Sequence, residues 1–200
     1  MMRRDCRRCG GKNMRVITGS ARGRRLGELK GMETRPTTDK VKESIFNCIQ
    51  FDVENARVLD LFAGSGQMGI EALSRGAQRA VFVDMRSEAC TVIRGNLEKT
   101  RLLARAQIVR SDFQSYLTRC REQFDLIFLD PPYDGIFLEN AMKSISEIDI
   151  LSDCGILICE RPAEKALPAQ LGALSLRREY RYGRASVSIY GKNSDLEQPL

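Results

Sequence analysis

The sequence contains no histidine in its 200 residues. This absence excludes Ser-His-Asp and Cys-His catalysis, and it excludes metal sites built on imidazole ligands. A general acid or base must therefore be a carboxylate, Lys, Tyr or Cys. The sequence also lacks a run of about 18 apolar residues that would span a membrane, and no apolar segment follows the N-terminal arginines as in a secretory signal. We expect a cytoplasmic protein without membrane contact.

The cysteines do not form a pattern that predicts disulfides or metal binding. Their number, seven, is odd, and they are scattered through segments with the character of helices and core strands. Cys6 and Cys9 have the spacing of half a zinc site, but no second pair and no histidine follows them, so we expect no metal. Residues 1–13 are expected to be a disordered leader in front of a functional start at Met14.

Positive charge is concentrated at the N-terminal end. Residues 1–30 contain ten Lys or Arg and two acidic residues, a local net charge of +8, whereas the whole chain carries +6 and the remainder therefore −2. This asymmetry favours a polyanionic partner, although a solvated tail that aids solubility gives the same pattern. Residues 14–18 and 24–29 are predicted to form a short basic β-hairpin. The candidate nucleic-acid contacts are Arg22, Arg24, Arg25 and Arg35.

Alternating apolar strands and amphipathic helices predict a single α/β domain. A first helix is expected to begin near Asp39. The expected strands are 58–62, 80–83, 106–110, 124–129 and 155–159, and the later helices are 68–75, 87–101, 113–121 and 137–148. Strands separated by helices predict a parallel sheet with helices on both faces, and a closing hairpin of 174–182 and 185–190 suggests one antiparallel strand. We assign residues 14–50 to the basic hairpin and first helix, 51–191 to the α/β domain and 192–200 to a polar tail.

A glycine-rich turn lies between the first strand of the α/β domain and its helix. Gly64, Gly66 and Gly69 match G-x-G-x-x-G, in which glycine permits a tight turn and the close approach of a ligand. Asp84 follows Gly64 by 20 residues, at the end of the second strand, where a carboxylate can accept from both ribose hydroxyls. The pattern predicts a nucleoside-bearing cofactor without identifying it, and a plain tight turn would use the same glycines.

Carboxylates at the ends of the first and third strands narrow the choice of cofactor. Asp60 lies four residues before Gly64, where it would repel a pyrophosphate and attract the ammonium or sulfonium of S-adenosylmethionine. An aspartate that caps the following turn is the structural alternative. Asp112 and Phe113 follow the third strand at the same edge, where they could supply a polar contact and an apolar edge to an adenine.

Asp130-Pro131-Pro132-Tyr133 directly follows the buried strand 124–129. At the carboxyl end of a strand in an open α/β sheet, these residues face the ligand crevice. The Asp130 carboxylate and the Pro131 carbonyl can accept from the two hydrogens of an aromatic amine, which exposes the lone pair of its nitrogen. Tyr133 can stack on a base turned out of its helix. The motif predicts methyl transfer to an exocyclic amino group, with Asp130, Pro131 and Tyr133 as catalytic residues.

From about Met14 to Gly191 the chain resembles the RsmD family, the bacterial 16S rRNA guanine-N2 methyltransferases. The Arg-Pro-Thr segment, the hairpin before it and their order are specific to that family. The glycine turn and Asp-Pro-Pro-Tyr are shared by many amino methyltransferases. The matching segments are 14–19, 35–39 leading to 43–47, 58–66 with 69–72, and 124–133.

The resemblance implies a class I S-adenosylmethionine-dependent methyltransferase fold, which is Rossmann-like. Its sheet is expected to be seven-stranded and mostly parallel, with the last strand antiparallel, and to carry a small N-terminal β-hairpin. The implied cofactor is S-adenosylmethionine. The implied substrate is the N2 amino group of a guanine in 16S rRNA of a small-subunit particle, methylated by a monomer. The candidate cofactor-binding residues are Asp60, Phe62, Gly64, Gly66, Asp84, Met85, Asp112 and Phe113.

Four other functions stay open at this point. A DNA adenine-N6 or cytosine-N4 methyltransferase uses the same tetrad, but such enzymes usually need a target-recognition region, and no insertion of useful size is present. A protein-glutamine methyltransferase uses a related tetrad, but typically with Asn at its first position. A non-catalytic RNA-binding assembly factor could retain the fold. A nicotinamide-dependent dehydrogenase would use the glycine turn but would leave Asp130 and the residues after it unexplained.

Overall fold

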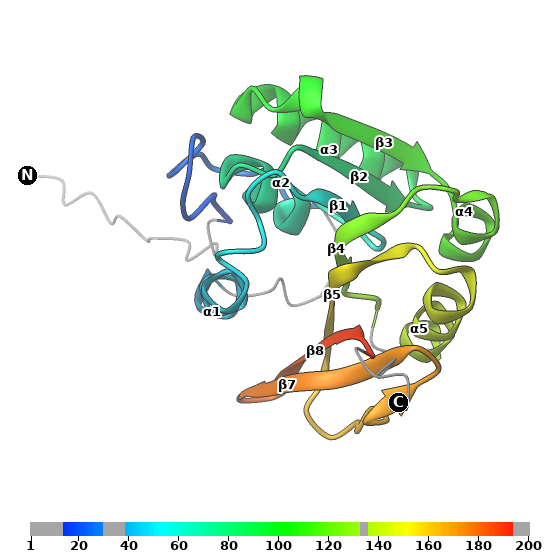
Figure 1. Ribbon diagram of the computed structural model, residues 1–200. Coiled ribbons are helices and arrows are strands. Elements are labelled where there is room, and N and C mark those ends of the chain that lie inside the picture. Colours follow the sequence, from blue (N-terminus) through cyan, green and yellow to red (C-terminus); the bar gives the residue numbers. More distant parts are fainter. Residues whose placement is uncertain (1–13, 30–38, 133–135, 194–200) are drawn as a thin grey trace, which may run out of the picture.

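The computed structural model describes residues 14–29, 39–132 and 136–193. In these ranges the chain forms an eight-stranded sheet with the strand order β3-β2-β1-β4-β5-β8-β7-β6 (Figure 1). The predicted leader, Arg35, Tyr133 and most of the predicted tail lie outside the described residues. The strands are β1 (Arg57–Asp60), β2 (Arg79–Asp84), β3 (Ala106–Arg110), β4 (Phe124–Leu129), β5 (Leu151–Pro162), β6 (Gln170–Leu171), β7 (Leu174–Tyr182) and β8 (Ala185–Lys192).

Helices cover both faces of the sheet, as predicted. The first face carries residues 14–29 and three helices, and the second face carries two helices (Figure 1). Each face has its own hydrophobic cluster, so the sheet is buried on both sides. None of the helices in the described residues is long and apolar enough to cross a membrane. The helices are α1 (Asp39–Cys48), α2 (Gln67–Ser74) and α3 (Ser87–Thr100) on the first face, α4 (Phe113–Arg119) and α5 (Phe137–Ile148) on the second, and the 3₁₀ turn η1 (Leu103–Arg105).

The strand directions confirm the predicted mostly parallel sheet. Strands β1 to β5 pair in parallel, whereas β8 runs antiparallel between β5 and β7. The strand number differs from the expected seven, because Gln170 and Leu171 add a two-residue strand beside β7. Two residues are too few to show the alternation of apolar and polar residues by which a strand is recognised in a sequence. Strand β5 is longer than the predicted 155–159, because β4 and β8 pair with it on its two sides.

Residues 14–29 form a reduced version of the predicted hairpin. Arg15 and Arg25 make a single antiparallel bridge, and the Leu26 N–H donates to the Met14 carbonyl at 2.9 Å. The intervening chain folds back on the first face instead of forming regular strands. The apolar side chains that it buries in the first-face core are Met14, Val16, Ala21 and Leu26.

A buried carboxylate, Glu71 of α2, holds the N-terminal segment to the sheet. Its oxygens accept from the backbone N–H groups of Ile17 at 2.7 Å and Thr18 at 3.0 Å. Arg75 Nε donates to the same carboxylate at 2.8 Å, and Lys42 Nζ of α1 lies 3.9 Å from it. Burial lowers the pKa of Lys42. One side chain thus ties together two helices and the N-terminal segment.

We predict that Glu71→Gln lowers the free energy of unfolding by about 3 kcal/mol or more, because it leaves the buried Lys42 without its counter-charge. Urea denaturation measures this as a lower midpoint at constant slope. The matched control is Glu147→Gln, which removes an exposed partner of Lys143 and should cost less than about 0.5 kcal/mol. Equal midpoints for the two variants would contradict the role of Glu71.

Candidate functional site

Carboxylates gather at the carboxyl edge of the sheet, on its first face. In β1, Val58 packs into the first-face core, and Asp60 two residues later lies on the same side of the strand. The same alternation places three further strand-end carboxylates on this side: Asp84, Asp130 and Glu160. Four acidic side chains therefore line one edge.

Asp130 stands beside the glycine turn. Asp60 is in register with Phe128, and the N–H of Leu61 donates to the Phe128 carbonyl at 3.1 Å. Asp130 follows Phe128 by two residues and is half-buried, and the alternation of side chains along β4 places it on the first face, as it does Asp60 in β1. The structure thus brings together two segments that are far apart in the sequence.

The structure explains each glycine of the turn for a different reason. Gly64 and Gly66 have positive φ angles of 55° and 78°, which favour glycine. A Cβ on Gly69 would lie 2.3 Å from the Phe82 ring, so glycine there lets α2 pack on β2. A Cβ on Gly64 would meet nothing closer than 3.9 Å, so this glycine does not pack against a neighbouring element. In the first turn of α2, the buried Oε1 of Gln67 has no hydrogen-bond partner among the described residues.

Asp60 is a buried acid at the start of the turn. Its Oδ2 accepts from the Gly69 N–H at 3.1 Å, which is the capping role named as the structural alternative. Burial raises the pKa of Asp60 to about 7, although the Gly69 hydrogen bond opposes this shift. A carboxylate has about four acceptor sites, so capping does not exhaust it. A nearby cation would stabilise its charged form.

Asp84 is engaged by groups of its own chain. Its Oδ2 accepts from the Gly64 N–H at 3.0 Å. Arg86 donates to both oxygens through its backbone N–H at 3.0 Å and through Nε and NH2 at 2.9 Å. These bonds use all four acceptor positions of the carboxylate. Ribose hydroxyls could therefore reach Asp84 by displacing the Arg86 guanidinium, whose side chain is 35% exposed.

Aromatic rings lie at this edge on the side of the second face. Phe62 and Phe113 lie with ring centroids 5.3 Å apart, and Phe137 of α5 meets Phe113 edge-on at 6.0 Å. Met85 is 67% exposed. Asp112 acts as the N-cap of α4 by accepting from the Ser115 N–H at 2.9 Å, and this bond keeps the pKa of Asp112 below its ordinary value.

A small pocket adjoins Pro131 and Pro132, directly after β4. Its wall is formed by side chains of α5 and the end of β5. Tyr133 lies outside the described residues, so its proposed stacking role stays a prediction. The residues of α5 and β5 that line the pocket are Leu138, Glu139, Glu160, Arg161 and Pro162.

Sequence reasoning missed several members of this edge. Arg86 follows Asp84 by two residues, a spacing that places a guanidinium within reach of the strand-end carboxylate. Glu160 directly follows the predicted strand 155–159 and was given no role, although the structure buries it at the end of that strand. Phe137 was assigned to a helix without a functional role.

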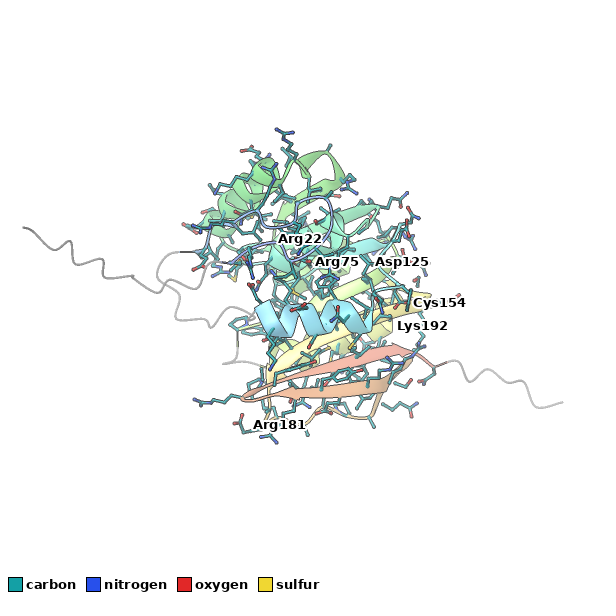
Figure 2. The ribbon with its side chains drawn as sticks, turned by 90° about the vertical axis from the view of Figure 1, so that its left-hand side faces the viewer. Arg22, Arg75, Asp125, Cys154, Arg181 and Lys192 are labelled. Atoms are coloured by element: carbon teal, nitrogen blue, oxygen red, sulfur yellow. The ribbon has the colours of Figure 1, made fainter. Side chains whose placement is uncertain are left out.

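The predicted basic residues of the N-terminal segment lie at the surface. Arg22, Arg24 and Arg25 are exposed, and Arg24 NH1 donates to the Lys99 carbonyl at 2.9 Å. In Figure 2, α1 lies between Arg22 above it and Arg181 below it. These positions are compatible with contacts to a polyanion.

Known proteins share both the sequence and the fold of this chain. It is 44% identical over 182 residues to YlbH of Bacillus subtilis, covering 90% of this chain and 99% of that protein. It is 32% identical over 188 residues to ribosomal RNA small subunit methyltransferase D of Escherichia coli, covering 94% of each. The solved structure of YhhF from Escherichia coli superposes with a TM-score of 0.81 at 33% identity, covering 90% of this chain and 98% of that one.

The match to a family model is equally extensive. The model described as "Conserved hypothetical protein 95" covers residues 14–191, which includes the N-terminal segment, the glycine turn and Asp130. The chain therefore belongs to the RsmD family of methyltransferases.

Proposed function

We propose that this protein transfers the methyl group of S-adenosylmethionine to the N2 amino group of a guanine in 16S rRNA. The observation that supports the proposal is the parallel pairing of β1 with β4, because the glycine turn and Asp130 follow the carboxyl ends of these two neighbouring strands. A methyl donor at the turn and an amine at Asp130 would be neighbours, and positioning is the main requirement of such a transfer. Membership of the RsmD family and the relative named for small-subunit rRNA methylation support the substrate.

The residues of the turn fit S-adenosylmethionine. When bound, this cofactor supplies an electrophilic methyl group on a sulfonium. Asp60 would attract the cationic amino acid end, and Asp84 would bind the ribose hydroxyls after releasing Arg86. Backbone at Gly64 and Gly66 would pass close to the cofactor. The remaining proposed contacts, mainly to the adenine, are Phe62, Met85, Asp112 and Phe113.

The target amine would be held after β4. The Asp130 carboxylate and the Pro131 carbonyl would accept from its two hydrogens, so that the nitrogen lone pair points at the methyl group. Asp130 can then take the proton that the nitrogen loses. Tyr133, from its place in the sequence, would stack on the extruded guanine.

The basic N-terminal segment would contact the RNA backbone. Arg22, Arg24 and Arg25 are exposed, and Arg35 is added from the sequence alone. We further propose that the enzyme acts in the cytoplasm, as a monomer, on a partly assembled small-subunit particle. Double-stranded DNA as substrate and a non-catalytic assembly role are the alternatives that the following experiment separates.

The proposal is tested by incubating the protein and labelled S-adenosylmethionine with small-subunit particles from a strain that lacks the gene, followed by mass spectrometry of the nucleosides. We expect N2-methylguanosine. Asp130→Ala should bind the cofactor normally and lose at least about tenfold in rate. The matched control is Asp153→Ala, which alters an exposed carboxylate at the opposite edge and should leave the rate unchanged. Methylation of duplex DNA alone, or no methylation, would reject the proposal.

Cofactor affinity should depend on pH through Asp60. Its pKa is about 7, so it is charged above this pH and neutral below it. The cationic cofactor favours the charged form, so affinity should fall as pH falls, by roughly tenfold from pH 8 to pH 6. Calorimetry across this range measures the effect. Asp60→Asn should bind more weakly and show no such slope, and a flat wild-type profile would contradict the role of Asp60.

Substitutions of Asp84 and of its partner Arg86 should have opposite effects on cofactor affinity. Asp84→Asn should weaken cofactor binding by about tenfold or more, since a charged acceptor for two hydroxyls is lost. Arg86→Ala removes the competing guanidinium and should bind at least as tightly as wild type. Calorimetry with S-adenosylmethionine compares the variants. If Arg86→Ala weakened binding as much as Asp84→Asn, the pair would be a fixed part of the site.

A further inference from the structure

The turn of the β7–β8 hairpin lies at the carboxyl edge of the sheet, beside the proposed site. Pro162, at the end of β5, pairs with Ala185, and Ala185 pairs with Tyr182. Leu129 pairs with Cys159, which puts Asp130 level with Glu160. The hairpin therefore extends about two residues, roughly 7 Å, beyond the level of Asp130.

Strand β7 presents two tyrosines to the face on which Asp130 lies. After an irregularity at Leu176, the residues Arg178, Tyr180 and Tyr182 alternate toward the first face, where both tyrosines pack against the core. The tyrosine rings are 26° from parallel, with centroids 6.5 Å apart.

A row across four neighbouring strands connects these rings to the proposed catalytic residue. It runs from Asp130 through Glu160 and Val187 to Tyr180. At about 4.8 Å per strand, this row is roughly 14 Å long. The rings thus lie within reach of nucleotides next to a base held at Asp130.

The inner ring is anchored before any ligand binds. Tyr180 and Cys48, at the end of α1, both pack against the first-face core, and the Cys48 side chain is the main cause that raises the pKa of Tyr180. Tyr182 lies nearer the turn, half-buried, with Tyr180 packed beside it. Anchoring of this kind reduces the conformational entropy lost on binding.

Unbalanced positive charge surrounds the rings. Residues 174–192 contain five basic residues and one acidic residue, Glu179, a net charge of +4. Glu179 is paired with Arg161, and Lys192 is bound to Asp149 and Asp153 at the far end of the hairpin. Figure 2 shows Arg181 at the opposite end of the hairpin from Lys192 and Cys154. The exposed arginines in the half of the hairpin next to its turn are Arg178, Arg181 and Arg184. Arg178 lies on the same side of β7 as the tyrosines, and Arg181 lies on the other side.

We propose that these residues form a second RNA contact, the hairpin ledge, which binds single-stranded RNA flanking the target guanine. The ledge consists of Arg178, Tyr180, Arg181, Tyr182 and Arg184. A base would stack on Tyr182, and the arginines would bind phosphates, a combination typical of single-strand recognition. The identity of the RNA rests on the proposed function.

A purely structural role explains the same charges less well than RNA binding does. Charged side chains on an edge strand discourage pairing with another sheet, and β6 covers β7 only at Leu174 and Ser175. That role requires neither paired tyrosines nor a position beyond the carboxyl edge. The aromatic pair on the proposed catalytic face favours RNA.

The test is the affinity for isolated 16S rRNA and for small-subunit particles, measured over a salt series without any methyl transfer. The triple variant Arg178→Gln, Arg181→Gln, Arg184→Gln should weaken binding and lower the slope of log affinity against log salt by about 2. Tyr182→Ala should weaken binding about tenfold, whereas Tyr182→Phe should retain it, because stacking needs the ring alone. At saturating RNA, kcat should stay within about twofold of wild type, so that KM rises.

The matched control removes three exposed charges, one at the end of α4, one in the loop after it and one on α5. Arg119→Gln, Arg121→Gln, Lys143→Gln should leave affinity and salt slope as in wild type. Equal affinities of the ledge and control variants for 16S rRNA would overturn the proposal. A loss confined to particles would also overturn it, because it would indicate a protein contact. If the ledge variants bind RNA weakly while wild type methylates none, the ledge stands and the proposed function fails.

Discussion

The structure depends on one buried carboxylate, that of Glu71. It lies in the helix after the glycine turn and accepts hydrogen bonds from the backbone of the N-terminal segment. Lys42 of α1 and Arg75, directly after α2, balance its charge. The N-terminal segment cannot form a sheet of its own, because it has a single bridge. Glu71 supplies the missing backbone partners, and so the basic segment is fixed to the helix that begins at the proposed cofactor site.

A second constraint acts at the carboxyl edge, where acidic groups stand close together. Burial and the repulsion of Asp84 disfavour charge on Asp60, while Arg86 compensates Asp84. A cationic ligand would therefore be stabilised at this edge. Without such a ligand, Arg86 neutralises the charge of Asp84. Basic groups lie farther out, in the N-terminal segment and on the hairpin ledge. The acidic residues at the centre would suit a cationic cofactor, and the basic residues on both sides of them would suit a polyanionic substrate.

The sequence predicted the order of strands and helices because each buried strand and each amphipathic helix has its own local signature. The strand β4 was predicted with its observed bounds, Phe124–Leu129, since a nearly continuous apolar run between polar residues leaves little choice. The glycine turn and Asp130 were also recognisable, because a fixed spacing of residue types encodes a local backbone shape. Their common edge followed from the rule that parallel strands end together.

Contacts between distant segments had no such signature. The register that sets Glu160 beside Asp130 and the packing of Tyr180 near Cys48 at the end of α1 depend on how far each strand extends and on which face it presents. The pairing of β6 and the reduction of the N-terminal hairpin were likewise decided by neighbouring elements. Local residue patterns determined which elements form and which chemistry they carry. Tertiary packing alone decided which side chains meet, because burial and hydrogen bonding are satisfied across the whole fold.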